Sequence, residues 1–137
     1  MRTKLKFRVL VAGLGLFGAV IPVFAHHSFS ADYDANKPVK VKGVVTKVEW
    51  TNPHAHYYID VVDEKGNVTN WNFELATINV LSRNGWTSKS LKVGDRVTVE
   101  GFAGKVVANR AAASAVVLAD GRALFAGAAN GGDSPGR

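Results

Sequence analysis

Residues 39–50 have the sequence VKVKGVVTKVEW, in which valines alternate with polar residues. An alternation with a period of two is typical of a β-strand with one buried face. The apolar face passes from odd-numbered positions before Gly43 to even-numbered positions after it: Val44, Val48 and Trp50. A slip of one residue at a glycine is typical of a β-bulge. We therefore expect one long, bent strand over 39–50, with its bulge at Gly43.

Two shorter alternating segments follow this strand. Residues 54–62 begin after the turn at 51–53, and residues 68–75 alternate in the same way. The three residues 64–66, which end in glycine, suit a hairpin loop between them. Antiparallel pairing around this loop predicts three cross-strand pairs: His56 with Glu74, Tyr58 with Asn72, and Asp60 with Asn70.

The remaining elements predict the fold class. Residues 77–86 have helical spacing and end at Asn84-Gly85, and strands are expected over 96–102 and 112–118. Three strands, a short helix and two more strands is the order of an OB-fold. We predict an all-β, five-stranded, OB-fold-like Greek-key barrel over 39–126, with one short helix between the third and fourth strands. A small β-sandwich is the alternative.

The ends of the chain are predicted to lie outside this barrel. Residues 1–25 have the pattern of a signal peptide, with four basic residues, an uncharged apolar run over 9–21, Pro22, and a cleavage site after Ala25. A membrane anchor is the rival interpretation, but spanning a bilayer takes about 20 apolar residues. Residues 26–38 are expected to form an irregular arm, and residues 127–137 a disordered tail.

The signal peptide also decides how the charge is interpreted. The whole chain carries a net charge of +6, but four of its 17 basic residues lie in this segment. Removing them leaves 13 basic residues against 11 acidic ones, a net charge of about +2. The mature protein is expected in the periplasm, with secretion as the alternative. Its contact with a membrane is expected only through the signal peptide, before cleavage.

The absence of cysteine excludes several kinds of chemistry. With no cysteine in the sequence, there is no disulfide, no thiolate metal ligand and no cysteine nucleophile. The sequence also lacks a glycine-rich phosphate loop, a serine elbow and an HExxH motif. We therefore expect no enzymatic activity. Arg96, Lys105 and Arg110 form no dense basic stripe, so nucleic acid is not expected as a partner.

The four histidines form two clusters, His26-His27 and His54-x-His56. Residues two apart on a strand project from the same face, so His54 and His56 can bind one ion, with Glu74 opposite on the neighbouring strand. Cleavage after Ala25 would put a free amine on His26, and amine and imidazole nitrogens together suit Cu(II). The sequence therefore predicts binding of Cu(II) or another transition metal through His26, His27, His54, His56 and Glu74.

Two other interpretations of the same face stay open. Tyr58, Asn70 and Asn72 could recognise a small polar ligand or an envelope protein partner without any metal, because OB-folds bind ligands over strands two and three. The third interpretation is a structural barrel whose exterior histidines are an ordinary surface feature. A metal site responds to pH and to chelators, whereas a partner-binding face does not.

Several short motifs connect this sequence to a known family. They are AHHSF at 25–29, VEWTNPH at 48–54, NW at 70–71, EL at 74–75, GW at 85–86, LKVGD at 91–95 and ADGR at 119–122. In these motifs the chain resembles domain of unknown function 6152, a family of small exported proteins of proteobacteria. The resemblance covers nearly all of the mature domain. It implies an exported OB-like domain and assigns no activity.

Overall fold

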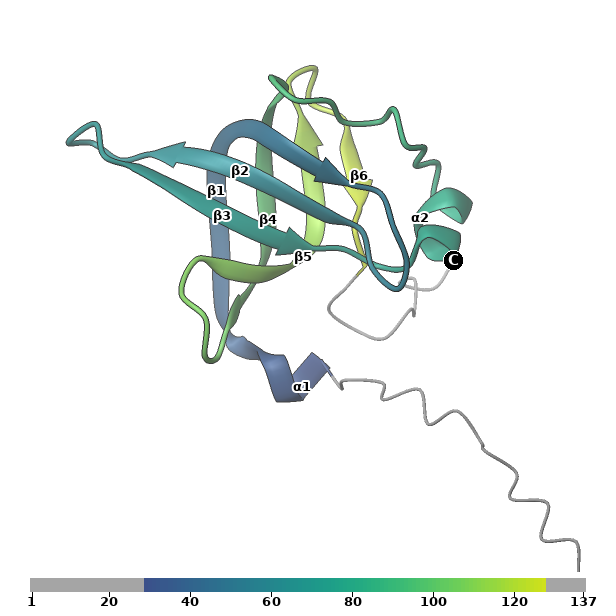
Figure 1. Cartoon of the computed structure of the whole chain (residues 1–137), viewed down its shortest axis with the longest axis horizontal. Coiled ribbons are helices and arrows are strands. Elements are labelled where there is room, and N and C mark those ends of the chain that lie inside the picture. Colours follow the sequence, from purple (N-terminus) through teal and green to yellow (C-terminus); the bar gives the residue numbers. More distant parts are fainter. Residues whose placement is uncertain (1–28, 128–137) are drawn as a thin grey trace, which may run out of the picture.

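The computed structural model describes residues 29–127. Two short helices and six strands make up this part of the chain (Figure 1). In chain order they are α1 (Phe29–Asp32), β1 (Tyr33–Glu49), β2 (His56–Val62), β3 (Val68–Glu74), α2 (Ile78–Arg83), β4 (Arg96–Gly104), β5 (Arg110–Leu118) and β6 (Ala123–Phe125). The expected signal peptide at 1–25 and nearly all of the expected tail at 127–137 lie outside the described residues. Within residues 29–127, no helix is long and apolar enough to cross a membrane.

Five of the strands close into a barrel. β1 pairs antiparallel with both β2 and β4, β2 pairs with β3, and β4 pairs with β5. A parallel pairing of β3 with β5 closes the ring. The predicted five-stranded OB-like barrel with a helix between the third and fourth strands is therefore confirmed. The short β6 adds to the free edge of β5 and was not predicted, because three residues show no clear alternation.

β1 belongs to both halves of the barrel. Its first part pairs with β4 as far as Val44, and its last part pairs with β2 from Val44 onward. The register shift lies between Val45 and Lys47, so the prediction of one long, bent strand is right but the predicted bulge position at Gly43 is wrong. The odd-numbered face continues through Gly43 to Val45, which is only 1% exposed. Val45, rather than Val44, is therefore the core residue.

Gly43 has a different role from the one predicted. A Cβ atom there would lie 2.2 Å from the backbone oxygen of Asp60 and 2.7 Å from Cγ2 of Ile59. The missing side chain therefore lets β2 approach β1 at the point where β1 changes partners.

The predicted irregular arm at 26–38 is wrong from residue 29 onward. Residues 29–32 form α1, and residues 33–38 begin β1. Tyr33 is buried, and its ring stacks on that of Phe29 at a centroid distance of 5.6 Å. The ring of Phe29 also meets the ring of Phe102 on β4 edge-on at 5.8 Å. These aromatic contacts order the segment, although its sequence shows no strand periodicity.

The barrel interior is apolar, and α2 contributes to it. The odd-numbered side chains of β2 and β3 point inward, and Tyr57, Ile59 and Phe73 are fully buried. The side chain of Thr77 caps α2, and Gly85, with a φ of 85°, follows its end. The buried Trp86 donates a hydrogen bond from Nε1 to the carbonyl oxygen of Phe125 at 2.7 Å. Because the odd-numbered positions are buried, the even-numbered positions of β2 and β3 form the outer face.

The close approach at Gly43 predicts a stability defect. Replacing Gly43 by alanine is expected to lower the free energy of unfolding by about 1–3 kcal/mol, because backbone atoms of β2 must move to make room for the methyl group. Urea denaturation followed by circular dichroism measures this change. The neighbouring Lys42→Ala variant, at an exposed position, is the control and should change stability by no more than about 0.5 kcal/mol. Equal stability of the two variants would contradict the steric argument.

Candidate functional site

The candidate site lies on the outer face of β2 and β3. The observed register pairs His56 with Glu74, Tyr58 with Asn72, and Asp60 with Asn70, so all three predicted pairs are confirmed. The loop between the strands is held by Asp63, whose carboxylate accepts hydrogen bonds from the backbone nitrogens of Lys65 and Asn67, each at 2.8 Å. This local turn fixes which residues of the two strands face each other.

Glu74 is at the centre of the site. Its Oε2 accepts hydrogen bonds from the hydroxyl of Tyr33 at 2.6 Å and from Nη2 of Arg110 at 2.8 Å. The guanidinium of Arg110 also lies 5.5 Å from the ring centroid of Tyr33. These residues come from β3, β1 and β5, so the carboxylate joins three strands where the barrel closes. The side chain of Glu74 is only 16% exposed, which weakens the screening of its ion pair by water.

The surroundings of Glu74 shift two pKa values. Burial opposes ionisation of the carboxyl group, but the hydrogen bonds from Tyr33 and Arg110 outweigh it and lower the pKa of Glu74. Burial and the neighbouring Glu74 carboxylate raise the pKa of Tyr33. Glu74 is therefore an anion and Tyr33 a neutral hydrogen-bond donor at neutral pH.

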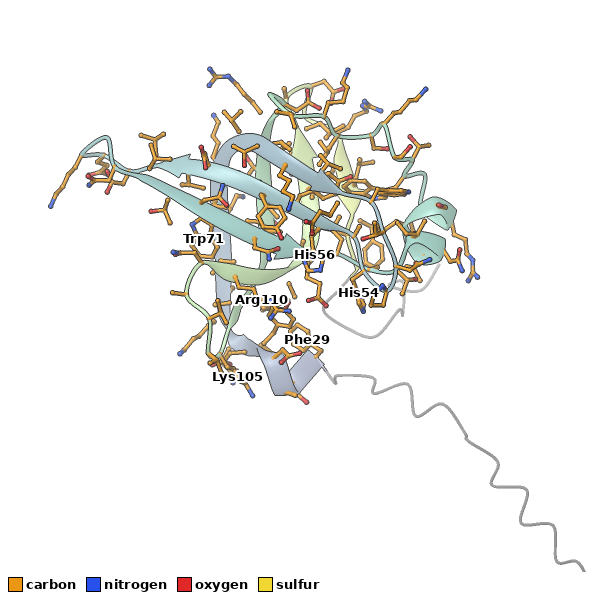
Figure 2. All side chains as sticks on the ribbon, in the orientation of Figure 1. Phe29, His54, His56, Trp71, Lys105 and Arg110 are labelled. Carbon is orange, nitrogen blue, oxygen red and sulfur yellow. The ribbon has the colours of Figure 1, made fainter. Side chains whose placement is uncertain are left out.

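Both histidines of the second cluster have one ring nitrogen engaged. Nδ1 of His54 donates a hydrogen bond to the carbonyl oxygen of Leu75 at 2.8 Å, and Nδ1 of His56 donates to Oδ1 of Asn72 at 2.9 Å. Nδ1 of His54 also lies 3.8 Å from Oε1 of Glu74. A proton held on Nδ1 leaves the lone pair of a neutral imidazole on Nε2. Figure 2 shows the two histidines on the same side of the barrel as Arg110.

The predicted polar ligand-binding residues are engaged with their neighbours. The hydroxyl of Tyr58 donates to Oε2 of Glu49 at 3.3 Å, and Nζ of Lys47 lies 4.8 Å from the centroid of its ring. Nδ2 of Asn70 donates to Oδ1 of Asp60 at 2.7 Å and to Oγ1 of Thr46 at 3.1 Å. Asn72 is the acceptor for His56. Tyr58, Asn70 and Asn72 therefore form a row of side chains that bond to protein groups.

The predicted metal ligands are only partly brought together. His54, His56 and Glu74 lie on one face, whereas His26 and His27 lie outside the described residues. Within residues 29–127, no three histidine, aspartate or glutamate side chains are arranged to hold a metal ion by themselves. The described part of the chain thus offers two imidazole nitrogens and a neighbouring carboxylate.

A family model matches most of this chain. It covers residues 15–112 and is described as a family of unknown function, DUF6152. The chain belongs to this family. None of the curated proteins matches the sequence of this DUF6152 member. The match extends over β1 to β4 and the first residues of β5, and thus over every residue of the outer face discussed above.

Two residues of the candidate site were missed by sequence reasoning. Tyr33 was placed in the irregular arm, and Arg110 was considered only as part of a loop that could bind nucleic acid. Glu74 lies 41 residues from Tyr33 and 36 from Arg110, so no local pattern connects them. An arginine at the start of a strand is the only signal available, and pairing it with Glu74 depends on knowing how the barrel closes.

The ion pair at Glu74 predicts a pH-dependent contribution to stability. Glu74→Gln is expected to cost about 1–3 kcal/mol at neutral pH, because it leaves Arg110 without its anionic partner. The folded-state pKa of Glu74 lies below its ordinary value of 4.5. The stabilisation is therefore present above about pH 4.5 and is lost as the pH falls through the folded-state pKa.

Urea denaturation of the wild type and of Glu74→Gln between about pH 6 and pH 3 tests this expectation. The difference in their free energies of unfolding should become smaller toward acid pH. Glu100→Gln is the control, since it breaks an ion pair with Lys40 in which both side chains are well exposed. Such surface pairs contribute at most about 1 kcal/mol. If the difference in free energy of unfolding between the wild type and Glu74→Gln stays constant with pH, the ion pair is not the cause of that difference.

Proposed function

We propose that this chain is an exported, non-enzymatic protein that binds a transition metal ion, Cu(II) first among them, through Nε2 of His54 and His56. The observation that carries the proposal is the hydrogen bonding of both rings through Nδ1, to Leu75 and to Asn72. Metal-binding histidines in proteins nearly always have their second nitrogen held in this way, which fixes the tautomer and the orientation of the ring. Export to the periplasm is part of the proposal and is supported by the signal-peptide pattern of residues 1–25.

The two histidines lie beside an ion pair. Glu74 is ionised and close enough to interact electrostatically with both rings. Its charge and that of Arg110 compensate each other, so the pair adds neither a net negative nor a net positive charge beside the histidines. Because Oε2 of Glu74 already accepts two hydrogen bonds, we assign Glu74 the role of a charged neighbour of His54, rather than the ligand role predicted from the sequence.

The chemistry of the ligands favours Cu(II) over other ions. Imidazole nitrogens bind copper, zinc and nickel, and among divalent metals of the first row the affinity is highest for Cu(II). Two ligands, His54 just before β2 and His56 at its first position, leave open positions on the ion, which water or further groups can occupy. The site is partly exposed, with the His54 side chain 38% accessible, so an ion can reach it without opening the barrel.

The alternative function, binding of a polar ligand or an envelope protein through Tyr58, Asn70 and Asn72, has less support. Each of these side chains already bonds to a neighbouring protein group, and a ligand would have to replace those bonds. The Nε2 atoms of His54 and His56 carry lone pairs, and they can bind a metal ion without first giving up a bond to a protein group. The metal-binding proposal therefore agrees better with the contacts.

Titration with Cu(II) tests the proposed function. The chain is produced by export through its own leader, and its amino terminus is determined by mass spectrometry. Replacing His54 and His56 together by alanine should weaken Cu(II) binding at least about 100-fold, because second-shell changes alone cost about 10–100-fold. Asp120→Ala, which removes an exposed carboxylate in the turn before β6, is the control and should bind as the wild type does. Unchanged binding by the double alanine variant would refute the proposal.

The hydrogen bond from His56 to Asn72 gives a second, finer prediction. Asn72→Ala keeps both proposed ligands but frees the ring of His56, and it should lower the affinity for Cu(II) about 10-fold. Isothermal titration measures this change, and a thermal melt shows that the fold is retained. Asn70→Ala is the matched control, since Asn70 lies on the same strand face but bonds to Asp60 and Thr46. If Asn72→Ala and Asn70→Ala lose the same affinity for Cu(II), the hydrogen bond from His56 to Asn72 does not contribute to metal binding.

A further inference from the structure

One edge of the β-sheet has no neighbouring strand in the described part of the chain. β3 pairs with β2 along its whole length, but its parallel pairing with β5 begins only at Asn72. Among residues 29–127, no strand therefore lies beside residues 68–71 on the side away from β2. Figure 1 shows that this part of β3 belongs to a hairpin that projects beyond the barrel. An unpaired edge of this kind is a template for another strand.

One hydrogen bond shows which backbone groups point out from this edge. The backbone nitrogen of Asn72 donates to the carbonyl oxygen of Asn109 at 2.9 Å, so the even-numbered residues of β3 direct their backbone groups away from β2. Val68 and Asn70 consequently present their N–H and C=O groups to the outside of the sheet. Such a row is paired by the backbone of another extended strand.

Exposed valines lie at both ends of this edge. Val68 and Val62 face each other across the far end of the hairpin, and both are exposed. At the other end, the loop between β4 and β5 carries Val107 and the 90% exposed Val106. These are four of the five large apolar side chains that are exposed in the described part of the chain. Because they gather around one unpaired edge, they mark an interaction surface.

The charges at the two ends of the edge are opposite in sign. The hairpin tip carries Asp63 and Glu64 against Lys65, whereas the loop between β4 and β5 carries Lys105. Within residues 29–127, neither Glu64 nor Lys105 has an ion-pair partner. The chain between the two ends is uncharged from residue 66 to residue 73. The edge therefore suits an uncharged strand whose basic end meets the hairpin tip and whose acidic end meets the loop.

We propose that two copies of this chain associate through this edge, with their β3 strands antiparallel across a two-fold axis at Thr69. In this register Val68 of each copy pairs with Asn70 of the other, and the outward backbone groups of both residues are used. A register centred on Asn70 would need the backbone nitrogen of Asn72, which is already bonded to Asn109. The two-fold axis brings the two different ends of the edge together twice.

The reason for choosing a second copy is that this chain supplies everything that the edge requires. Antiparallel pairing places the hairpin tip of each copy against the β4–β5 loop of the other. Val68 then approaches Val106 and Val107, and Glu64 approaches Lys105. Apolar and charged groups are thus covered in the same register that pairs the backbone. The proposal uses neither histidine of the candidate site and does not rest on metal binding.

Sedimentation equilibrium of the exported chain in EDTA tests the proposal. We expect a monomer–dimer equilibrium for the wild type. Val106→Lys should weaken dimerisation about 100-fold or more, because two-fold symmetry places the lysine in the interface twice and each lost valine contact is worth about 10-fold. Val93→Lys is the matched control, since Val93 is 66% exposed but lies in the turn before β4. It should leave the Kd unchanged, and thermal melts show that the barrel is retained in both variants.

Charge reversal tests the register of the two copies. Glu64→Lys and Lys105→Glu should each weaken dimerisation about 3–10-fold, because each one replaces two exposed attractions by repulsions. Together they restore both pairs with exchanged signs, and the double variant should dimerise nearly as well as the wild type. Such a recovery cannot come from damage to the fold.

A cysteine at the two-fold axis gives an independent test, because the chain has no cysteine of its own. Facing residues of a non-hydrogen-bonded antiparallel pair have Cα atoms about 4.5 Å apart, within the range of a disulfide. Mild oxidation should therefore convert Thr69→Cys into a disulfide-linked dimer, seen on a non-reducing gel. Val93→Cys, exposed but outside the proposed interface, should remain largely monomeric.

Each contrary outcome overturns the proposal. A wild-type protein that stays monomeric up to about 1 mM would leave the edge to a strand from a different protein. A dimer that Val106→Lys and Val93→Lys weaken equally, or not at all, would be formed through another surface. Failure of the double charge reversal to recover dimerisation, or of Thr69→Cys to cross-link, would exclude the antiparallel register. None of these results bears on the proposed function, which the Cu(II) titration tests separately.

Discussion

The carboxylate of Glu74 bonds to Tyr33 and Arg110 at the place where the barrel closes. β3 and β5 pair in parallel there over only three residues each, and parallel pairing is the less stable kind. The side-chain bonds of Glu74 add to this short seam and connect it to the beginning of β1. Without them, the seam would depend on the backbone of three residue pairs and on the small buried side chains beside it, Ala111 and Ala112. The closure of the barrel and the attachment of the start of β1 therefore depend on the same polar contact, that of Glu74 with Tyr33 and Arg110.

The same contact decides the electrostatics of the outer face. Hydrogen bonds from Tyr33 and Arg110 keep Glu74 ionised in spite of its burial. His54, just before β2, and His56 on β2 consequently lie beside the Glu74–Arg110 ion pair, and each ring is oriented by an acceptor on or just after β3. A site whose side chains are already held in place loses little conformational entropy when it binds an ion. The features that stabilise the fold at this seam are thus also those that surround the two histidines of the proposed metal site.

Much of the fold could be predicted because it follows from local rules. Alternation with a period of two identified β2 and β3, and the loop over 64–66 set their register. The stop signal at Asn84-Gly85 ended α2 correctly. The bulge in β1 could not be located in this way, because Val44 and Val45 are adjacent valines and either can continue an apolar face. The close approach of Asp60 to Gly43 keeps the odd-numbered face inward as far as Val45. Tyr33 was missed because its aromatic partners, rather than an alternating pattern, order its segment.

For the candidate site, the sequence by itself determined that His56 lies on a strand opposite Glu74, with His54 two residues before it, since the period of a strand and the length of a hairpin loop are local properties. Only the tertiary structure decided what Glu74 bonds to and which nitrogen of each imidazole is engaged. Each of these facts depends on contacts between residues far apart in the sequence, such as Tyr33 with Glu74 and Glu74 with Arg110. Such contacts exist only after the strands have closed into a ring, and no periodicity along the chain encodes them.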